Sequence, residues 1–337
     1  MKPRGGREPR TILVTRLRFL GDVILTTPVL GALAKAFPGA AVDYLCERPY
    51  DEVLAGHPHL RRVVAWDRAR EGLGALLGRI RGRYDAVIDL FGNPRSAWLT
   101  GLSGAPARVG QGSFPRSLLY NRRPAPGAPG EHAVRHHLRF VEVLCGPQPH
   151  ADPVVAVGAA QRAEGRRLLE DRGLGEGAVA ILTGASQPNK EWPAAAFVRL
   201  AAQISMAGRH RPVFLGQPGK RERLARIREL SHSQVVILPE LGVAALAGLL
   251  ANCRALVTGD GGVMHLAVAL GVPTLALFGP SDPDIWFPYG HLPHAELLCV
   301  AADCRPCHKH ECDDPFCMEG IDPEAAFARL QALLERT

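Results

Sequence analysis

The segment from Gly259 to Gly262 (GDGG) has residues suited to holding an anion at the start of a helix. Residues 255–258 before it predict a buried strand, and residues 263–270 after it predict a helix. The first turn of a helix has free backbone N–H groups and the positive end of the dipole, and glycines let an anionic ligand come close. We therefore predict that this segment binds a diphosphate without a metal. We also expect the turn of residues 259–262 to be too crowded for side chains larger than those present. His265, in the first turn of this helix, could reach the same ligand. The alternative is an ordinary turn in which Asp260 is the helix N-cap and nothing binds.

Two further residues could act on such a ligand. Asp22 is the only carboxylate in the loop after the first predicted strand, and it could be a general base that takes a proton from an attacking hydroxyl. Its alternative role is a helix N-cap. Lys190 precedes the predicted start of a helix, where a cation is unfavourable unless an anion lies beside it. Its alternative is a solvated surface lysine.

Four of the eight cysteines form a second candidate site, with the spacing C-x2-C-x4-C-x4-C. They are Cys304, Cys307, Cys312 and Cys317, with His308 and His310 between them. Four thiolates could make a closed tetrahedral zinc site. The alternatives are a loop packed through small thiols and a disulfide formed on oxidation.

Composition limits the class of protein. The chain has 337 residues, of which 47% are hydrophobic and 22% charged, so we expect two domains of a globular protein without a membrane span. The basic N-terminus lacks the apolar region of a signal peptide, which predicts a cytoplasmic protein. The net charge of +7 fits an acidic partner. Charge alone does not choose among nucleic acid, anionic lipid and a phosphorylated substrate.

The elements that must position these residues alternate between strand and helix. Continuous apolar strands, near residues 11–15, 41–45, 62–65, 86–90 and 108–110, are followed by a second series near 179–183, 212–215, 235–238, 255–258 and 273–278. Such strands, separated by helical patterns, predict parallel sheets covered on both faces, an α/β fold. The proline-rich segment 145–153 reads as a domain connector. Ligands of such sheets bind beyond the carboxyl ends of the strands, so the loops 16–22, 90–95, 184–192 and 259–265 are the informative ones.

The order of the motifs resembles the ADP-heptose:lipopolysaccharide heptosyltransferases of glycosyltransferase family 9. The motifs are Gly21-Asp22 followed by Thr27-Pro28, then DLFGNPR at 89–95, KEWP at 190–193, GDGGVMHLA at 259–267 and LFGPSDP at 277–283. The cysteine-bearing tail also resembles many members. The resemblance covers nearly the whole chain.

This resemblance implies the GT-B architecture, in which two Rossmann-like domains face each other. Residues 1–150 would be the acceptor-binding domain, residues 151–320 the nucleotide-sugar domain, and residues 321–337 a helix packing back on the first domain. The transfer would be inverting and would require no cofactor. Asp22 would be the general base, while Lys190, Glu222, Asp260, Gly261, Gly262 and His265 would bind the donor. Many members have Ser or Thr where Gly261 stands. Members often carry an acidic residue near Lys220 that reaches the ribose, and Glu222 is the candidate substitute for it.

The resemblance also implies the partners of the protein. The donor would be ADP-heptose and the acceptor the inner core of lipopolysaccharide, met by Arg16, Arg18, Arg95 and Arg116, with Arg122 and Arg123 also available. The protein would lie peripherally on the anionic inner face of the inner membrane, without nucleic acid as a partner. Alternatives are another nucleotide sugar or acceptor, a sugar-nucleotide epimerase or hydrolase, and a nonenzymatic sugar-binding protein.

Overall fold

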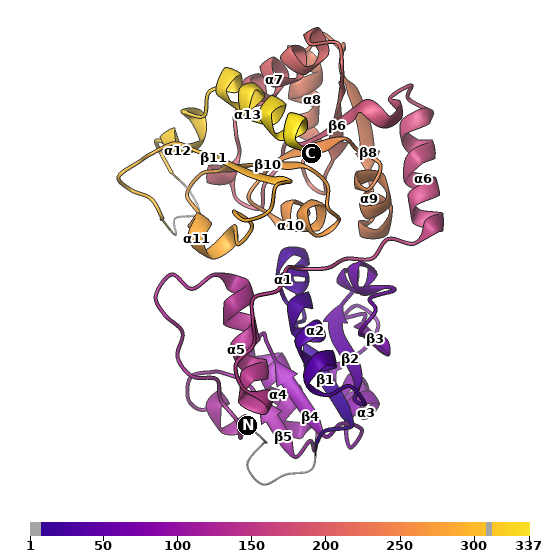
Figure 1. Ribbon diagram of the computed structural model, residues 1–337, viewed down its shortest axis with the longest axis vertical. Helices are drawn as coiled ribbons and strands as arrows, with labels where there is room; N and C mark the ends of the chain where they lie inside the picture. The colour runs from indigo at the N-terminus through magenta and orange to yellow at the C-terminus, as the bar shows by residue number, and fades with distance from the viewer. Residues whose placement is uncertain (1–7, 308–311) are drawn as a thin grey trace. The chain divides into compact units, whose positions relative to one another are not determined.

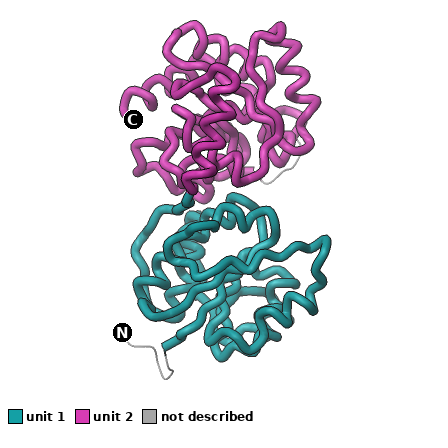
Figure 2. Tube along the Cα trace, turned by 90° about the vertical axis from the view of Figure 1, so that its right-hand side faces the viewer, with its two compact units in different colours: residues 1–156 teal, residues 157–337 magenta. Residues whose placement is uncertain are grey.

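The computed structural model describes residues 8–307 and 312–337. The chain divides into two compact units, residues Met1–Ala156 and Val157–Thr337 (Figure 2). The boundary falls slightly beyond the predicted connector because the chain stays attached to unit 1 up to this point. The backbone N–H of Val154 donates to Thr27 Oγ1 at 2.9 Å, and Val155 is buried.

Unit 1 is built on a five-stranded parallel sheet in the order β3-β2-β1-β4-β5 (Figure 1). The strands are β1 (Thr11–Thr15), β2 (Ala41–Glu47), β3 (Arg62–Trp66), β4 (Ala86–Asp89) and β5 (Ala107–Val109). The helices are α1 (Leu20–Leu25), α2 (Thr27–Ala36), α3 (Leu73–Ile80), α4 (Pro94–Leu102) and α5 (Ala133–Cys145), with 3-10 turns η1 (Tyr50–Leu54) and η2 (Arg116–Leu119). The apolar strands are buried throughout their centres, as a sheet covered on both faces requires.

The helical segment after β1 is two helices in the structure, α1 and α2. Pro28 lies in the first turn of α2, where its missing N–H is no loss, so the chain breaks at Thr26 between α1 and α2. The break leaves α1 as a helix of one and a half turns beyond the end of β1, and this short helix carries Asp22.

Unit 2 is built on a six-stranded parallel sheet in the order β11-β10-β9-β6-β7-β8. The strands are β6 (Ala178–Leu182), β7 (Arg211–Gly216), β8 (Val236–Glu240), β9 (Ala255–Gly259), β10 (Thr274–Phe278) and β11 (Ala295–Cys299). The helices are α6 (Ala159–Glu170), α7 (Ala194–Met206), α8 (Arg221–Leu230), α9 (Val243–Leu250), α10 (Gly262–Ala269), α11 (Pro283–Trp286), α12 (Phe316–Glu319) and α13 (Pro323–Arg336), with 3-10 turns η3 (Gly175–Gly177) and η4 (Pro188–Lys190). The sequence did not predict β11, whose residues are mostly only half-buried and include Glu296.

The last helix, α13, differs from the prediction that it packs on the first domain. Its apolar residues Ala326, Leu330 and Leu333 are buried in the core of unit 2, against α7, β10 and β11 (Figure 1). The indole of Trp192 fixes the start of this helix by donating to the carbonyl of Ile321 at 2.9 Å. The apolar stripe of α13 is therefore used within unit 2.

Candidate active site

In unit 1, Asp22 and Arg16 form an ion pair at the carboxyl end of β1. Arg16 Nη2 lies 2.7 Å from Asp22 Oδ1, and the side chain of Asp22 is 21% exposed. The other oxygen, Oδ2, accepts the backbone N–H of Phe19 at 3.0 Å, at the start of α1. Asp22 therefore helps to cap α1, although the N-cap residue itself is Phe19. Its carboxylate also stays accessible beside a cation.

The loop after β4 holds Arg16 in place. Arg16 Nη1 donates to the carbonyl of Leu90 at 2.9 Å, and its guanidinium lies 4.7 Å from the ring centre of Phe91. The loop is in turn organised by Asp89, which is fully buried and accepts the hydroxyl of Tyr120 at 2.7 Å and the N–H groups of Phe91 and Gly92. Burial raises the pKa of Asp89, although these hydrogen bonds oppose the shift. The DLFGNPR motif therefore positions Arg16, and Arg16 positions Asp22.

The other predicted acceptor-binding arginines are distributed around the same loops. Arg116 donates to the carbonyl of Gly92 at 2.9 Å, so it shares the loop after β4 with Arg16. Arg18 is half-buried and lies over the ring of Phe19. Arg95 is exposed on the first turn of α4.

In unit 2, the structure joins Lys190 and Asp260, which are far apart in the sequence. Lys190 Nζ lies 2.7 Å from Asp260 Oδ2, and the hydroxyl of Ser281 donates to the same oxygen at 2.6 Å. Lys190 is therefore not a solvated surface lysine, since its side chain is only 20% exposed. Asp260 is 8% exposed, and its carboxylate orients the lysine.

The start of α10 is open, as a diphosphate site requires. Gly261 is the N-cap residue, and in the described part of the chain no side chain caps this helix, so the N-cap role considered for Asp260 is wrong. The expectation of a crowded turn is also wrong at Gly261. A Cβ atom there would have no atom within 4 Å, and the backbone is extended, with φ 174°. Gly262 is the first residue of the helix, and its N–H belongs to this open turn.

His265 is buried one turn into α10. Its Nδ1 lies 2.8 Å from the hydroxyl of Tyr289, and the two rings meet edge to face with centres 5.7 Å apart. The ring is 3% exposed. The contact with Tyr289 gives His265 a packing role whether or not it also meets a ligand.

Glu191 connects Lys190 to the beginning of α8. Its two carboxylate oxygens bind Lys220 at 2.6 Å and Arg223 at 3.1 Å. Arg223 also donates to the carbonyls of Thr183 and Trp192, so it ties the loop after β6 to α8.

An open cavity of about 870 Å³ lies beside α8, at the carboxyl ends of β7 and β8. Its polar lining includes Gln217, Arg221 and Glu240. Glu222, the predicted donor-binding acid, is exposed on the first turn of α8 and does not line this cavity. The acid that lines the cavity is Glu240. On α8, Arg221 lines the cavity, and Glu222 is on another face of the helix.

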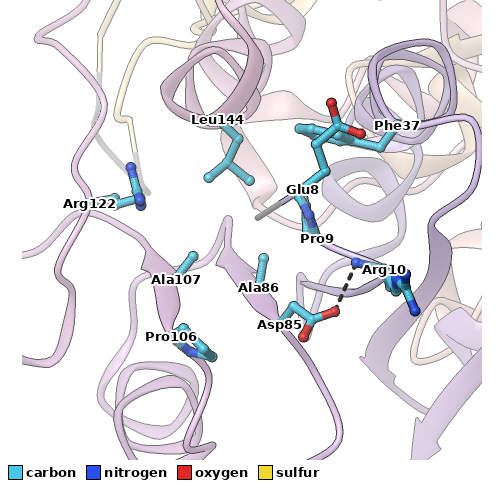
Figure 3. Close-up of a pocket in the computed structure, with 10 residues that line it drawn as sticks. All are labelled: Glu8, Pro9, Arg10, Phe37, Asp85, Ala86, Pro106, Ala107, Arg122 and Leu144. Carbon is cyan, nitrogen blue, oxygen red and sulfur yellow. Dashed lines mark hydrogen bonds between the residues drawn. The ribbon is translucent and has the colours of Figure 1, made fainter. Parts of the chain in front are cut away.

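A second cavity, of about 380 Å³, lies in unit 1 (Figure 3). It is at the end of the sheet opposite to the one that carries Asp22. Ala86 and Ala107, which line it, are the first residues of β4 and β5. Asp85, the residue before β4, also lines the cavity and accepts the backbone N–H of Arg10 at 2.8 Å (Figure 3). This cavity is at the amino ends of the strands, and one of the arginines that line it is Arg122, named above as also available to an acceptor.

The four cysteines of the predicted zinc site do not close around a common centre. In residues 8–307 and 312–337, no three of their sulfur atoms lie within 4.8 Å of one another. Cys317 is buried in the core of unit 2, where burial raises the pKa of its thiol, whereas Cys304 and Cys312 are exposed. His308 and His310 lie outside the described residues. As they stand, the described thiols do not fit a tetrahedral zinc site.

Three residues of the site were missed by the sequence reasoning. They are Ser281, Glu191 and Glu240. Ser281 and Glu191 lie inside two motifs used for the resemblance, LFGPSDP and KEWP, so their position after a strand was a usable signal. Glu240 is the last residue of β8, two residues beyond the predicted end of that strand and after an irregularity in the pairing of β7 with β8, which no local pattern indicated.

The chain is similar to several known proteins. The sequence model of glycosyltransferase family 9 (heptosyltransferase) matches residues 74–316. Lipopolysaccharide heptosyltransferase 1 of Pseudomonas aeruginosa is 32% identical, over 96% of this chain and 98% of its own length. A family 9 glycosyl transferase from Veillonella parvula superposes with a TM-score of 0.85 at 24% identity, covering 97% of this chain and 98% of that one. An Escherichia coli heptosyltransferase solved with ADP gives a TM-score of 0.72 at 25% identity, covering 97% and 100%.

A parallel α/β fold in two units, with an open helix start beside a lysine at the carboxyl ends of the strands, defines a class of enzymes that act on phosphorylated ligands. Within that class, the chain belongs to glycosyltransferase family 9, the heptosyltransferases. It is a glycosyltransferase of GT-B architecture.

Proposed function

We propose that this protein transfers heptose from ADP-heptose to the inner core of lipopolysaccharide. Its relatives are named lipopolysaccharide heptosyltransferases, and one similar structure holds ADP and another an ADP-heptose analogue. The single observation that carries the proposal is the Lys190–Asp260 pair, 2.7 Å across, beside an uncapped helix start. Together they provide a cation and free N–H groups for a diphosphate.

The proposed reaction is a single displacement that inverts the anomeric carbon. A hydroxyl oxygen of the acceptor forms a bond to that carbon, and the bond from the carbon to the diphosphate oxygen breaks. ADP leaves with the electron pair, and the hydroxyl proton passes to Asp22. The ion pair with Arg16 directs one oxygen of Asp22, while the other is held by Phe19. The charge on the departing diphosphate is stabilised by Lys190 and the first turn of α10, a type of contribution that is usually large. These residues supply positive charge without a metal ion.

The nucleoside part of the donor would occupy the 870 Å³ cavity beside α8. Carboxylates accept hydrogen bonds from ribose hydroxyls, and Glu240 is the acid that lines this cavity. We expect Glu240→Gln to weaken ADP binding by roughly fivefold to tenfold, since one hydrogen bond to a charged group is affected. Glu222→Gln is the matched control on the neighbouring helix, and titration calorimetry with ADP compares the two. A larger loss of ADP affinity from Glu222→Gln than from Glu240→Gln would return the role to Glu222.

The acceptor would meet the arginines of unit 1. Arg16 and Arg116 are held by the loop after β4, and Arg18 and Arg95 lie on the adjoining segments. In the part of the chain that the structure describes, no helix is long and apolar enough to cross a membrane. The proposed location is peripheral, in the cytoplasm at the inner face of the inner membrane, because the proposed acceptor is a glycolipid.

Heptosyl transfer is tested with purified full-length protein, ADP-heptose and a heptose-free lipopolysaccharide acceptor. The expected result is ADP release that depends on the acceptor, with an acceptor product heavier by one heptose. A UDP-sugar and a GDP-sugar are the matched donor controls. ADP release at the same rate without acceptor would support a hydrolase instead, and turnover of another nucleotide sugar in preference would move the protein to a different donor.

Structural zinc at Cys304, Cys307, Cys312 and Cys317 stays a prediction. The thiols would have to move together to form it, since they are not gathered in the described residues. Elemental analysis of protein purified without chelator tests it, and a zinc content near zero would reject it.

A further inference from the structure

One long stretch of unit 1 carries positive charge without any acid. From Leu90 to Gly130 the sequence has no Asp or Glu, although the chain has 33 acidic residues in all. The five cations in the stretch are Arg95, Arg108, Arg116, Arg122 and Arg123. A local field of one sign attracts an anionic partner.

The same stretch exposes large apolar side chains. Trp98 and Leu102 on α4 are 52% and 48% exposed, and Phe114 and Leu118 on the segment that includes η2 are 80% and 67% exposed. These four residues, termed the apolar patch, lie on two segments that pack against each other. Gly101 allows this contact, because a Cβ atom there would lie 2.5 Å from the side chain of Leu119. Grouped apolar exposure of this kind marks an interaction surface.

The arginines share the exposed faces of these segments. On α4, Arg95, Trp98 and Leu102 are separated by three and four residues, so they lie along one face of the helix. Arg116 is held by the carbonyl of Gly92 and the hydroxyl of Ser113, and Arg123 by the carbonyl of Ser117. These partners are neutral, so each arginine keeps its full charge for a partner outside the chain.

We propose that the apolar patch and its arginines dock unit 1 on an anionic phospholipid bilayer. Trp and Phe side chains suit the headgroup level of a membrane, and arginines suit the lipid phosphates beside them. The charge argues for lipid over a protein partner, since a protein interface would pair the arginines with its own acids only at particular positions, whereas an anionic bilayer meets all of them. The inference rests on the proposed function only in that a glycolipid acceptor requires an enzyme at the membrane.

The test is sedimentation of the full-length protein with phosphatidylcholine vesicles, with and without phosphatidylglycerol. We expect binding that requires phosphatidylglycerol and weakens with added salt. Trp98→Ser with Phe114→Ser should lower the partition coefficient at least about tenfold, because two interfacial aromatic anchors are lost. Arg123→Gln should lower it about fivefold. The matched control is Met206→Ser, on α7 of unit 2, which is 86% exposed and should leave binding unchanged.

Tryptophan fluorescence locates the contact independently. Trp66 and Trp192 are buried, so in a Trp286→Phe background Trp98 is the remaining exposed indole. Its emission should move to shorter wavelength with anionic vesicles and be quenched by brominated lipid. Unchanged emission, equal binding to neutral and anionic vesicles, or equal loss in the Met206 variant would overturn the proposal. So would patch variants that alter only self-association, since that would assign the surface to a second copy of the chain.

A soluble, deacylated acceptor separates this inference from the proposed function. The Trp98→Ser, Phe114→Ser variant should transfer heptose to that acceptor at the wild-type rate. If the wild-type protein binds vesicles but does not transfer heptose to this acceptor, the proposed function is rejected and the membrane surface is kept. If transfer is normal and the patch variants still bind vesicles, the proposed membrane surface is rejected and the proposed function is kept.

Discussion

Each unit has an aspartate beside a cation at the carboxyl end of a central strand. The two pairs differ in how accessible the carboxylate of the aspartate is. In unit 1, Asp22 is 21% exposed and its two oxygens have separate partners, Arg16 and the N–H of Phe19. In unit 2, Asp260 is 8% exposed and one oxygen receives both Lys190 and Ser281. An accessible carboxylate can accept a proton from a substrate, whereas a buried one mainly fixes its cation. This difference is the basis on which we propose chemistry for Asp22 and positioning of Lys190 for Asp260.

The largest expected effect comes from removing the carboxylate of unit 1. Asp22→Asn should lower kcat by about 10²- to 10⁴-fold, because the amide cannot accept the hydroxyl proton. The dissociation constant for ADP should stay near that of the wild type, since the donor elements are in unit 2. Steady-state kinetics and calorimetry measure the two quantities. A variant with the wild-type kcat would remove Asp22 from the mechanism and end the contrast between the two aspartates.

Changing the cation of unit 2 should affect binding more than chemistry. We expect Lys190→Met to weaken ADP binding by roughly tenfold to hundredfold, as for the loss of a charge-assisted hydrogen bond. It should also destabilise the fold, because Asp260 is left buried with Ser281 alone. The double variant Lys190→Met, Asp260→Asn should recover stability without recovering ADP affinity. ADP affinity equal to the wild type in the single variant would show that Lys190 serves only the carboxylate.

Two buried histidines of unit 1 predict a pH dependence of stability. Burial, with a smaller effect of His59, lowers the pKa of His57 to about 4 from 6.5, and burial also lowers the pKa of His137. Because these folded-state pKa values lie below the unfolded value, their stabilisation is present above pH 6.5 and is lost as pH falls toward 4. We expect His57→Gln to reduce the loss of unfolding free energy between pH 6.5 and 5 by about 1 kcal/mol. Denaturant titrations at both pH values measure it, and a pH profile identical to the wild type would reject His57 as a source.

Much of the fold followed from the sequence because its strands are continuous apolar runs. The predicted strand at residues 11–15 has the bounds of β1, and the other nine predicted strands all exist with small shifts at their ends. Two errors have a tertiary cause. β11 is half-buried at an edge of the sheet, so its pattern is weak. The last helix has an apolar stripe that the sequence can recognise, but only packing decides that the core of unit 2 receives it.

The candidate site was predictable only to the level of loops. Asp22, Lys190 and Asp260 lie after the strands where parallel sheets bind ligands, and that rule selected them. The pairing of Lys190 with Asp260 depends on neighbouring strands β6 and β9, which are distant in the chain. The cavity beside α8 needs the ends of β7 and β8 as well, so Glu240 had no local signal. The crowding inferred for the GDGG turn failed at Gly261, where glycine is not required for space.

The open space at Gly261 gives the smallest predicted effect and the finest test of unit 2. Gly261→Thr should fit without strain, since its Cβ would have no atom within 4 Å and the extended backbone suits any residue. The new hydroxyl would stand at the N-cap position of α10 and could donate to a bound phosphate. We expect ADP binding to tighten about threefold to fivefold, the scale of one neutral hydrogen bond. Gly261→Val, of the same shape without the hydroxyl, is the matched control and should not tighten binding. Equal affinities for the Thr and Val variants would mean that the phosphates do not approach this turn, and the anion site would have to rest on Lys190 alone.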